Sequence, residues 1–439
     1  MSSRWGDEEA DKALKQKEKE EKARKKLLKQ QKLEQEAAKK AAEEEAARAA
    51  QASQTNDGER PAKRQRTDAT TEADTTDDGA RPLYRFPAPS WKPCRHVNEY
   101  ETLNAIEEGS YGWVSRARST RTGEVVALKH LKMDTLHEGF PITALREIQA
   151  LKQSSHRHIV SLHEIVTGNM PSDIYLVMEF VEHDLKTLQE EMDIPFRVSE
   201  VKTLMLQITA AVDYLHTHWI LHRDLKTSNI LLNNRGEIKI ADFGMARQFG
   251  DPMPPHLTQL VVTLWYRAPE LLLGAEKYDQ AIDVWSLGCI MGELLQNNPI
   301  LQGKNEVDEL ARIFALCGIP TDKSWPKFRS LPNARSLKFP SNKSRESKIR
   351  ATFPDLSPAG GRLLEDLLSL NPNRRPDTAE VLEHPWFMED PRPKSTAMFP
   401  TFPSKASQER RRRRPTPQAP RGGEAPRLDA ADFSGVFGS

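Results

Sequence analysis

The chain has 439 residues, of which 37% are hydrophobic and 29% are charged, and its formal net charge is +1. This composition is too polar for a wholly globular protein, so we expect part of the chain to be unfolded. Three widely spaced cysteines argue against a disulfide framework, while a charged N-terminus and the lack of a long apolar run predict no secretory signal and no membrane span.

Residues 1–50 are rich in Lys, Glu and Ala, and from residue 7 onward they lack Pro and Gly. Pairs such as Glu18/Lys22 and Glu21/Lys25 have the i,i+4 spacing that supports a helix. The leucines do not sustain a heptad repeat. A charged, partly formed single helix is therefore favoured over a partner-binding coiled coil.

Two further low-complexity segments flank the middle of the chain. Residues 51–99 are rich in Thr, Asp and Ser and predict a disordered linker, within which Pro61–Arg66 is either a nuclear import signal or a chance basic cluster. Residues 388–439 are rich in Pro and Arg and predict a disordered tail. Three interpretations of its run Arg410–Arg414 stay open: RNA binding, import-receptor binding, or simple solvation of the tail. We expect a nuclear protein, and a cytoplasmic fraction is left open.

The middle segment, residues 100–387, carries the periodic apolar patterns of a folded domain. Strand patterns dominate before about residue 180, and helix patterns dominate after it. The sequence therefore predicts an α+β fold with a small β-rich lobe and a larger helical lobe. The clearest strand patterns lie at 125–128, 174–178 and 237–240, and the clearest helix patterns at 198–217, 280–296 and 360–370.

The domain opens with a glycine-containing segment, Ile106–Val114. A loop that crosses phosphate groups needs glycines so that backbone N–H groups can approach the phosphate oxygens. Only Gly109 and Gly112 are available here, and taken alone the pattern fits a plain turn better.

Lys129 ends a strand pattern, and Glu147 lies on a predicted helix farther along the chain. An isolated strand lysine is ordinarily a solvated edge residue. An ion pair between the two would instead aim the Lys129 ammonium at the α- and β-phosphates of a nucleotide.

Two motifs decide between these interpretations. The segment His222–Asn229 offers a carboxylate at Asp224 to accept a hydroxyl proton, and an ammonium at Lys226 to neutralise a transferring phosphoryl group. Asn229, and Asp242 of the triplet Asp-Phe-Gly, offer the oxygen ligands that Mg²⁺ prefers. A loop of solvated polar residues is the alternative, but so many fixed positions make chance improbable. We therefore expect Mg²⁺ and a phosphate-bearing ligand at this site.

Three residues farther along the chain have predicted structural roles. Glu270, in the triplet Ala-Pro-Glu, is expected to pair with Arg375. Asp283 is expected to cap the backbone of the segment His222–Asn229, which we call the catalytic loop. Both arrangements would hold the loop without touching a substrate.

Together these motifs resemble the eukaryotic protein kinases across roughly 290 residues. Pro141–Glu147 and Val261–Arg267 narrow the resemblance to the cyclin-dependent kinases, and Ile106–Gly109 is similar to the PITSLRE group in particular. Two departures stand out: Glu107 occupies the place of the usual first glycine, and Ala144 replaces the serine of the group's name. The resemblance implies a bilobal kinase fold and transfer of the ATP γ-phosphoryl group to Ser or Thr.

The resemblance also implies a nucleotide slot. Met178 would be the gatekeeper, the backbones of Glu179 and Val181 would receive adenine, and Asp184 would face the ribose. The residues implied to line the slot or to cover the phosphates are Ile106, Glu107, Glu108, Gly109, Ser110, Tyr111, Gly112, Trp113, Val114, Ala127, Lys129, Met178, Glu179, Val181, Asp184 and Leu231.

Acceptor sites followed by proline are implied as well. Val261 and Val262, with Arg267 nearby, would shape a pocket that tolerates a residue lacking an N–H group.

Control of the activity follows from the same resemblance. Thr258 would be the activating phosphosite, whereas Ser110 and Tyr111 would be inhibitory phosphosites over the ATP phosphates. A cyclin would bind the helix Pro141–Glu147 and push Glu147 inward. The arginines expected to receive the Thr258 phosphate are Arg146, Arg223 and Arg247.

These expectations combine into a cyclin-dependent serine/threonine kinase in transcription, RNA processing or cell-cycle control. The alternative is a kinase-fold scaffold or a nucleic-acid-associated regulator with weak catalysis. A scaffold would need one of the Lys, Asp or Asn residues named above to be missing, and the sequence contains all of them.

Overall fold

A computed structural model describes residues 93–109, 112–133, 140–170, 172–192, 194–254, 257–258, 262–337 and 346–402, with the side chains of 107–109 and 336 excepted. The chain divides into two units, Met1–Ala88 and Pro89–Ser439, and all described residues belong to the second. The predicted helical arm, the basic cluster at 61–66 and the arginine run at 410–414 therefore lie outside the described residues. Other predicted positions that lie outside them are Ser110, Tyr111 and Val261.

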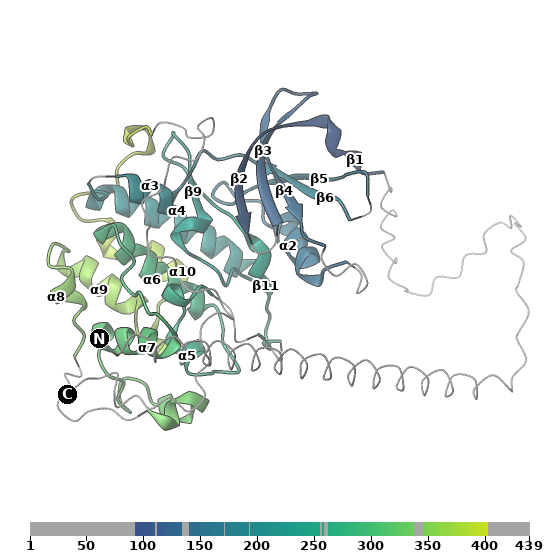
Figure 1. Cartoon of the computed structure of the whole chain (residues 1–439). Coiled ribbons are helices and arrows are strands. Elements are labelled where there is room, and N and C mark those ends of the chain that lie inside the picture. The colour runs from purple at the N-terminus through teal and green to yellow at the C-terminus, as the bar shows by residue number, and fades with distance from the viewer. Residues whose placement is uncertain are drawn as a thin grey trace, which may run out of the picture. The chain divides into compact units, whose positions relative to one another are not determined.

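The N-terminal lobe is built on one six-stranded sheet with the strand order β1-β5-β6-β4-β3-β2 (Figure 1). Its strands are β1 (Arg95–His96), β2 (Tyr100–Gly109), β3 (Gly112–Ser119), β4 (Val125–Leu131), β5 (Leu162–Thr167) and β6 (Ile174–Glu179), and its helix is α2 (Ile142–Gln153). Neighbouring strands are antiparallel except β1 and β5, which run parallel. The inner strand β4 is buried from Val126 to Leu131, as its run of apolar and β-branched residues requires.

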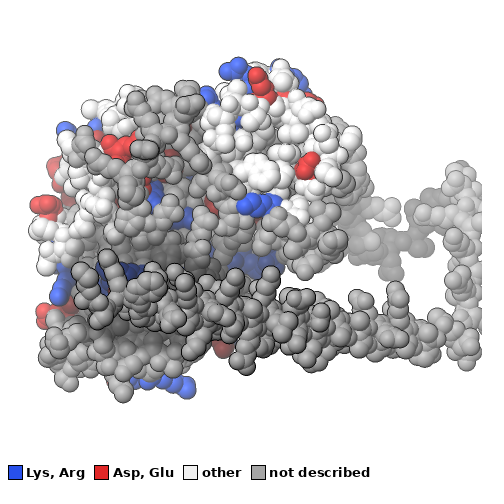
Figure 2. Space-filling view, in the orientation of Figure 1, with Lys and Arg blue, Asp and Glu red and all other residues white. Residues whose placement is uncertain are grey.

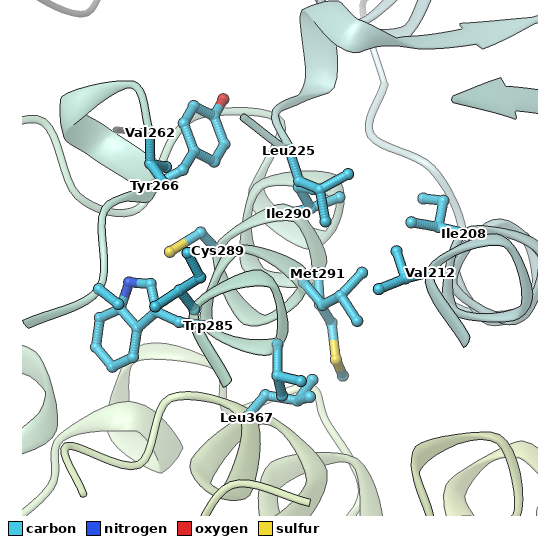
Figure 3. Packing of buried hydrophobic residues seen from close by; sticks show 14 of the residues in the cluster. Ile208, Val212, Leu225, Val262, Tyr266, Trp285, Cys289, Ile290, Met291 and Leu367 are labelled. Atoms are coloured by element: carbon cyan, nitrogen blue, oxygen red, sulfur yellow. The ribbon is translucent and has the colours of Figure 1, made fainter. Parts of the chain in front are cut away.

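The C-terminal lobe is helical. Its helices are α3 (Leu185–Glu191), α4 (Val198–Thr217), α5 (Pro269–Leu272), α6 (Ala281–Gln296), α7 (Glu306–Cys317), α8 (Ile349–Thr352), α9 (Pro358–Leu367) and α10 (Thr378–Leu382). Helix α6 is largely apolar on every face and almost wholly buried, which is the pattern of a core helix. Figure 3 shows Trp285, Ile290 and Met291 of this helix among side chains from α4, α9 and the catalytic loop.

Short strands carry the residues between the two lobes. β9 (Ile230–Leu232) and β10 (Ile238–Ile240) form an antiparallel hairpin, and β7 (His183–Asp184) pairs with β9. β8 (Ile220–Leu221) pairs with β11 (Arg247–Gln248). The predicted α+β fold with a small β-rich lobe and a larger helical lobe is confirmed.

The folded part extends past both predicted boundaries. Residues 93–99, assigned above to a disordered linker, contain β1, which pairs with β5. Residues 388–402, assigned above to a disordered tail, contact the C-terminal lobe: Phe399 is buried and Lys394 pairs with Glu200. Composition alone did not indicate that these two stretches are folded, because the partners that stabilise them lie far away in the sequence.

The described surface carries charges of both signs. On the face seen in Figure 2, blue and red side chains are interspersed among white ones. None of the described helices combines the length and the apolar character that crossing a membrane requires.

Candidate active site

The Lys129 ammonium joins three elements in one ion cluster. It donates to Glu147 Oε1 at 2.6 Å and to Asp242 Oδ1 at 3.1 Å. Lys129 lies in β4, Glu147 in α2 and Asp242 just after β10, so the predicted ion pair is present and has a third member. Burial lowers the pKa of Lys129, but the carboxylates of Asp242 and Glu147 outweigh it and raise that pKa. Burial raises the pKa of Asp242, but the Lys129 charge outweighs it and holds that pKa below its usual value.

The Asp224 carboxylate accepts hydrogen bonds from three neighbours. Lys226 Nζ donates to Oδ2 at 2.7 Å, and the Asn229 amide nitrogen donates to the same oxygen at 3.2 Å. Thr263 donates to Oδ1 through its backbone N–H at 3.1 Å and its hydroxyl at 2.7 Å. The structure therefore brings Asp224, Lys226 and Asn229 together, and Thr263 is a partner to which the sequence assigned no role.

Asp283 of α6 holds the backbone of this loop. Its carboxylate accepts hydrogen bonds from the N–H groups of His222 at 3.0 Å and Arg223 at 2.9 Å. The predicted cap is thus confirmed. The predicted pair of Arg375 with Glu270 is confirmed as well, as a two-pronged contact with N–O distances of 2.6 and 2.7 Å.

The hairpin β9–β10 carries both residues predicted to bind a metal ion. Asn229 directly precedes β9, and Asp242 follows β10 by two residues. Asp242 has a φ of 62°, a left-handed conformation that is uncommon outside glycine. Carboxylate and amide oxygens suit Mg²⁺. Among the described residues no cluster of three or more His, Cys, Asp or Glu side chains is placed to hold a metal ion.

Strand register gathers several of the predicted slot residues. Val114 is paired with Lys129 across β3 and β4, and Ala127 is paired with Met178 across β4 and β6.

Asp184 is paired with Leu231 across β7 and β9. The Asp184 carboxylate also accepts the N–H of Thr187 at 2.7 Å, and so caps α3. One of its oxygens therefore has a structural role that the sequence did not indicate.

Trp113 is the exception among the predicted slot residues. Its ring stacks on the His130 ring with centroids 4.0 Å apart. His130 follows Lys129 in β4, and successive side chains of a strand point to opposite faces, so Trp113 lies on the face away from Lys129. The nucleotide-binding role expected of Trp113 therefore stays a prediction for its backbone, since its side chain lies on the other face.

The three predicted phosphate-binding arginines lie near one another. Burial lowers the pKa of Arg247, and the neighbouring charges of Arg146 and Arg223 lower it further. Arg223 Nη1 donates to the Tyr278 hydroxyl at 2.8 Å, and that hydroxyl donates to the carbonyl of Thr258 at 2.7 Å. Tyr278, which no motif indicated, thus links Arg223 to the segment that carries Thr258.

The carbonyl of Val262 is already occupied. It accepts hydrogen bonds from Arg267 Nε at 3.2 Å and Nη2 at 2.9 Å, and Arg267 Nη1 donates to Glu306 at 2.7 Å. Val262 has a φ of 67°, a strained value for a β-branched residue. Glu306, at the start of α7, was not indicated by any motif because it lies well outside the segment it supports.

Comparison with known proteins agrees with this geometry. Residues 100–387 match the family model described as "Protein kinase domain". The chain is 52% identical to Cyclin-dependent kinase G-1 of Oryza sativa subsp. indica over 326 residues, which are 72% of this chain and 46% of that protein. It is 53% identical to Serine/threonine-protein kinase ppk23 of Schizosaccharomyces pombe over 321 residues, which are 73% of this chain and 80% of that protein.

A third relative is Cyclin-dependent kinase 11B of Homo sapiens, which is 48% identical over 336 residues, or 76% of this chain and 42% of that protein. The chain therefore spans less than half the length of the rice and human relatives. The family match covers well over half of the chain, and the fold and the placement of the motif residues accord with it. The chain belongs to the protein kinase family and, within it, to the cyclin-dependent kinases.

Proposed function

We propose that the chain is a cyclin-dependent serine/threonine kinase that transfers the γ-phosphoryl group of ATP to Ser or Thr residues followed by Pro. The observation that carries the proposal is the pair of hydrogen-bonded clusters around Lys129 and Asp224. Between them they contain the side chains assigned here as the base, the two phosphate-binding lysines and the metal ligands.

Asp224 acts as the base. The loop that Asp283 holds in place directs its carboxylate to the acceptor hydroxyl, whose proton it takes late in the transfer. Lys226, within 2.7 Å of that carboxylate, neutralises charge on the transferring group. The proximity of the two side chains supports these roles.

Lys129, held by Glu147, binds the α- and β-phosphates. Asn229 donates through its amide nitrogen to Asp224, which leaves the amide oxygen as its metal ligand beside Asp242. Mg²⁺ bound there supplies positive charge that offsets the charge on the β- and γ-phosphates.

Adenine is proposed to lie in an apolar slot next to Met178, with the backbones of Glu179 and Val181 as its hydrogen-bonding partners. Asp184 is proposed to face the ribose. Pairing of Ala127 with Met178 and of Asp184 with Leu231 supports this slot. Its apolar walls are assigned to Ile106, Val114, Ala127 and Leu231, and the phosphate cover to residues 107–112.

The preference for proline rests on Val262. Its carbonyl is taken by Arg267 and is not available to the N–H of a substrate residue, so a buried N–H would be left without a partner there. Proline lacks that N–H and avoids the cost.

Two regulatory inputs are proposed. Phosphorylated Thr258 would be bound by the three arginines, one of which, Arg223, is already linked to the Thr258 carbonyl through Tyr278. A cyclin would cover α2, where Ile142 is 62% exposed and Leu145 is 52% exposed, and would hold Glu147 against Lys129. Inhibition through Ser110 and Tyr111 remains a proposal from the sequence. So do nuclear localisation and RNA or import-receptor binding by Arg410–Arg414.

The test is phosphoryl transfer from ATP to paired peptides that contain Ser-Pro, Ser-Ala or Tyr-Pro. The full-length chain would be expressed with candidate cyclins, and the cyclin that copurifies would be kept in the assay. Transfer to Ser-Pro well above the other two supports the proposal. A chain lacking residues 1–85 and 403–439 separates the alternatives. A kinase keeps its activity on the peptides, whereas a nucleic-acid-associated regulator loses its binding to nucleic acid.

A further inference from the structure

Residues 389–402 form a segment that follows the family-matched domain and runs from the start of α4 to the tip of the β9–β10 hairpin. We call it the C-terminal strap. It begins at Glu389, whose carbonyl accepts a hydrogen bond from the fully buried Lys202 of α4 at 2.9 Å. A buried ammonium needs such a partner, so this end of the strap is strongly specified.

The middle of the strap is fastened to the first turns of α4. Lys394 donates its backbone N–H to the Ser199 carbonyl at 3.0 Å, and its own carbonyl accepts the Thr203 hydroxyl at 2.6 Å. The Lys394 ammonium also contacts Glu200 at 2.7 Å. Three kinds of contact to one helix end leave this part of the strap little freedom.

The far end of the strap closes on the turn between β9 and β10. Gly236 in that turn has a φ of +74°, a conformation that favours glycine, and a Cβ there would lie 2.7 Å from the Thr396 carbonyl oxygen. Phe399 covers the same glycine and is 7% exposed. The N–H of Phe402 donates to Asn234 Oδ1 at 2.9 Å. The strap therefore lies directly on the hairpin turn.

The hairpin that the strap holds is the one that carries the metal ligands. Asn229 precedes β9 and Asp242 follows β10, whereas the strap contacts the opposite end of the same hairpin. The Phe402 ring also contacts the ring of His183, which precedes Asp184 in β7, with the two ring centroids 6.0 Å apart. A hairpin with only three residues in each strand is marginal by itself and depends on what packs against it.

We propose that the C-terminal strap is a positioning element for the nucleotide and magnesium site, acting through Asn234 and Phe402 on the β9–β10 hairpin. The inference rests on the proposed function, since it takes Asn229 and Asp242 as metal ligands. By fixing the hairpin tip, the strap sets where those two oxygen ligands stand relative to Lys129.

The experiment measures binding of the fluorescent nucleotide mant-ATP to the full-length chain, with Mg²⁺ and with EDTA, so that no cyclin is needed. Asn234→Ala removes the acceptor for the Phe402 N–H, and Phe402→Ala removes the ring. Each should weaken Mg²⁺-dependent binding about fivefold, Asn234→Ala through one lost hydrogen bond and Phe402→Ala through the lost ring contact with His183, with a smaller loss in EDTA. Asn234→Asp keeps an acceptor oxygen and should stay within about twofold of the wild type.

Two controls separate positioning from stability. Met398→Ala alters a strap residue that is 67% exposed and should leave binding unchanged. Ile313→Val removes a buried methylene from α7, away from the hairpin, and should lower the melting temperature without changing the dissociation constant.

The results distinguish the two proposals. If Asn234→Ala and Phe402→Ala lower the melting temperature as Ile313→Val does but bind Mg²⁺ and mant-ATP like the wild type, the strap only stabilises the domain and the inference is overturned. A wild-type chain that shows no Mg²⁺-dependent binding at all would overturn the proposed function together with it.

Discussion

The Tyr266 hydroxyl donates to the Glu293 carboxylate at 2.7 Å beneath the catalytic loop. The other oxygen of Glu293 accepts the hydroxyl of Thr227, the residue after Lys226, at 2.8 Å. Glu293 is 3% exposed, and burial raises its pKa from 4.5 to about 7. A buried carboxyl group thus connects the catalytic loop to the segment that follows Thr263.

Stability should therefore fall with rising pH through Glu293. Because folding favours the protonated acid, its stabilising contribution is complete below about pH 4.5 and is lost as the pH rises through about 7. Glu293→Gln cannot ionise and does not lose this contribution. When the pH rises from about 5.5 to about 8.5, its free energy of unfolding should therefore increase by about 2 kcal/mol relative to that of the wild type. Urea unfolding at the two pH values measures this gain. Glu365→Gln, in an exposed pair with Arg350, should show no such change, and a pH-independent difference for Glu293→Gln would contradict the assignment.

Substitution of the base should separate binding from turnover. Asp224→Asn keeps the side-chain shape but cannot accept the hydroxyl proton, so kcat should fall by about 10²–10⁴. The dissociation constant for Mg·ATP should stay within about twofold, because Lys129, Asn229 and Asp242 are unchanged. Single-turnover assays and nucleotide titration give the two quantities. Retained turnover would remove Asp224 from the role of base.

Proline specificity should weaken when Arg267 loses its partner. Glu306→Gln leaves the buried guanidinium without its 2.7 Å counter-charge, so Arg267 should hold the Val262 carbonyl less firmly. The ratio of kcat/KM for Ser-Pro to that for Ser-Ala peptides should drop about tenfold, roughly the effect of one charged hydrogen bond. Arg312→Gln breaks an exposed pair on the same helix and should leave the ratio unchanged. Equal ratios in all three proteins would argue against this pocket.

Activation by phosphorylation should depend on the Tyr278 bridge. Tyr278→Phe removes the hydroxyl that joins Arg223 to the Thr258 carbonyl. The conformation in which the arginines bind the phosphate should therefore be less populated. We expect the ratio of phosphorylated to unphosphorylated activity to fall about fivefold, as for one lost hydrogen bond. Mass spectrometry would confirm equal phosphate occupancy at Thr258. Thr258→Ala cannot be phosphorylated, so its activity should not increase at all. An increase in Tyr278→Phe as large as that of the wild type would show that the bridge has no part in activation.

Local motifs predicted which of these side chains lie together because their spacing along the chain is short or falls in regular elements. Lys129 and Glu147, or Asp224 and Asn229, lie on a strand, a helix or one loop whose geometry follows from the pattern. Glu306 and Tyr278 were missed because their partners are set by tertiary packing, which no local pattern encodes.

Two further features have physical causes as well. The Trp113 side chain stacks on His130 because alternation along β3 places neighbouring side chains on opposite faces. The C-terminal strap was missed because its composition is that of a disordered tail, while its contacts are long-range: Lys394 and Glu200 are 194 positions apart. Such contacts stabilise a segment that has no secondary structure pattern of its own.

The parallel pairing of β1 with β5 has a practical bearing on recombinant work. A fragment trimmed to 100–387 would lack β1 and would expose the N–H and C=O groups of the β5 edge, a template for aggregation. The same fragment would lack Glu389, whose carbonyl accepts a hydrogen bond from the buried Lys202 ammonium. Fragments for crystallisation or inhibitor screening should therefore begin before Arg95 and end after Phe402.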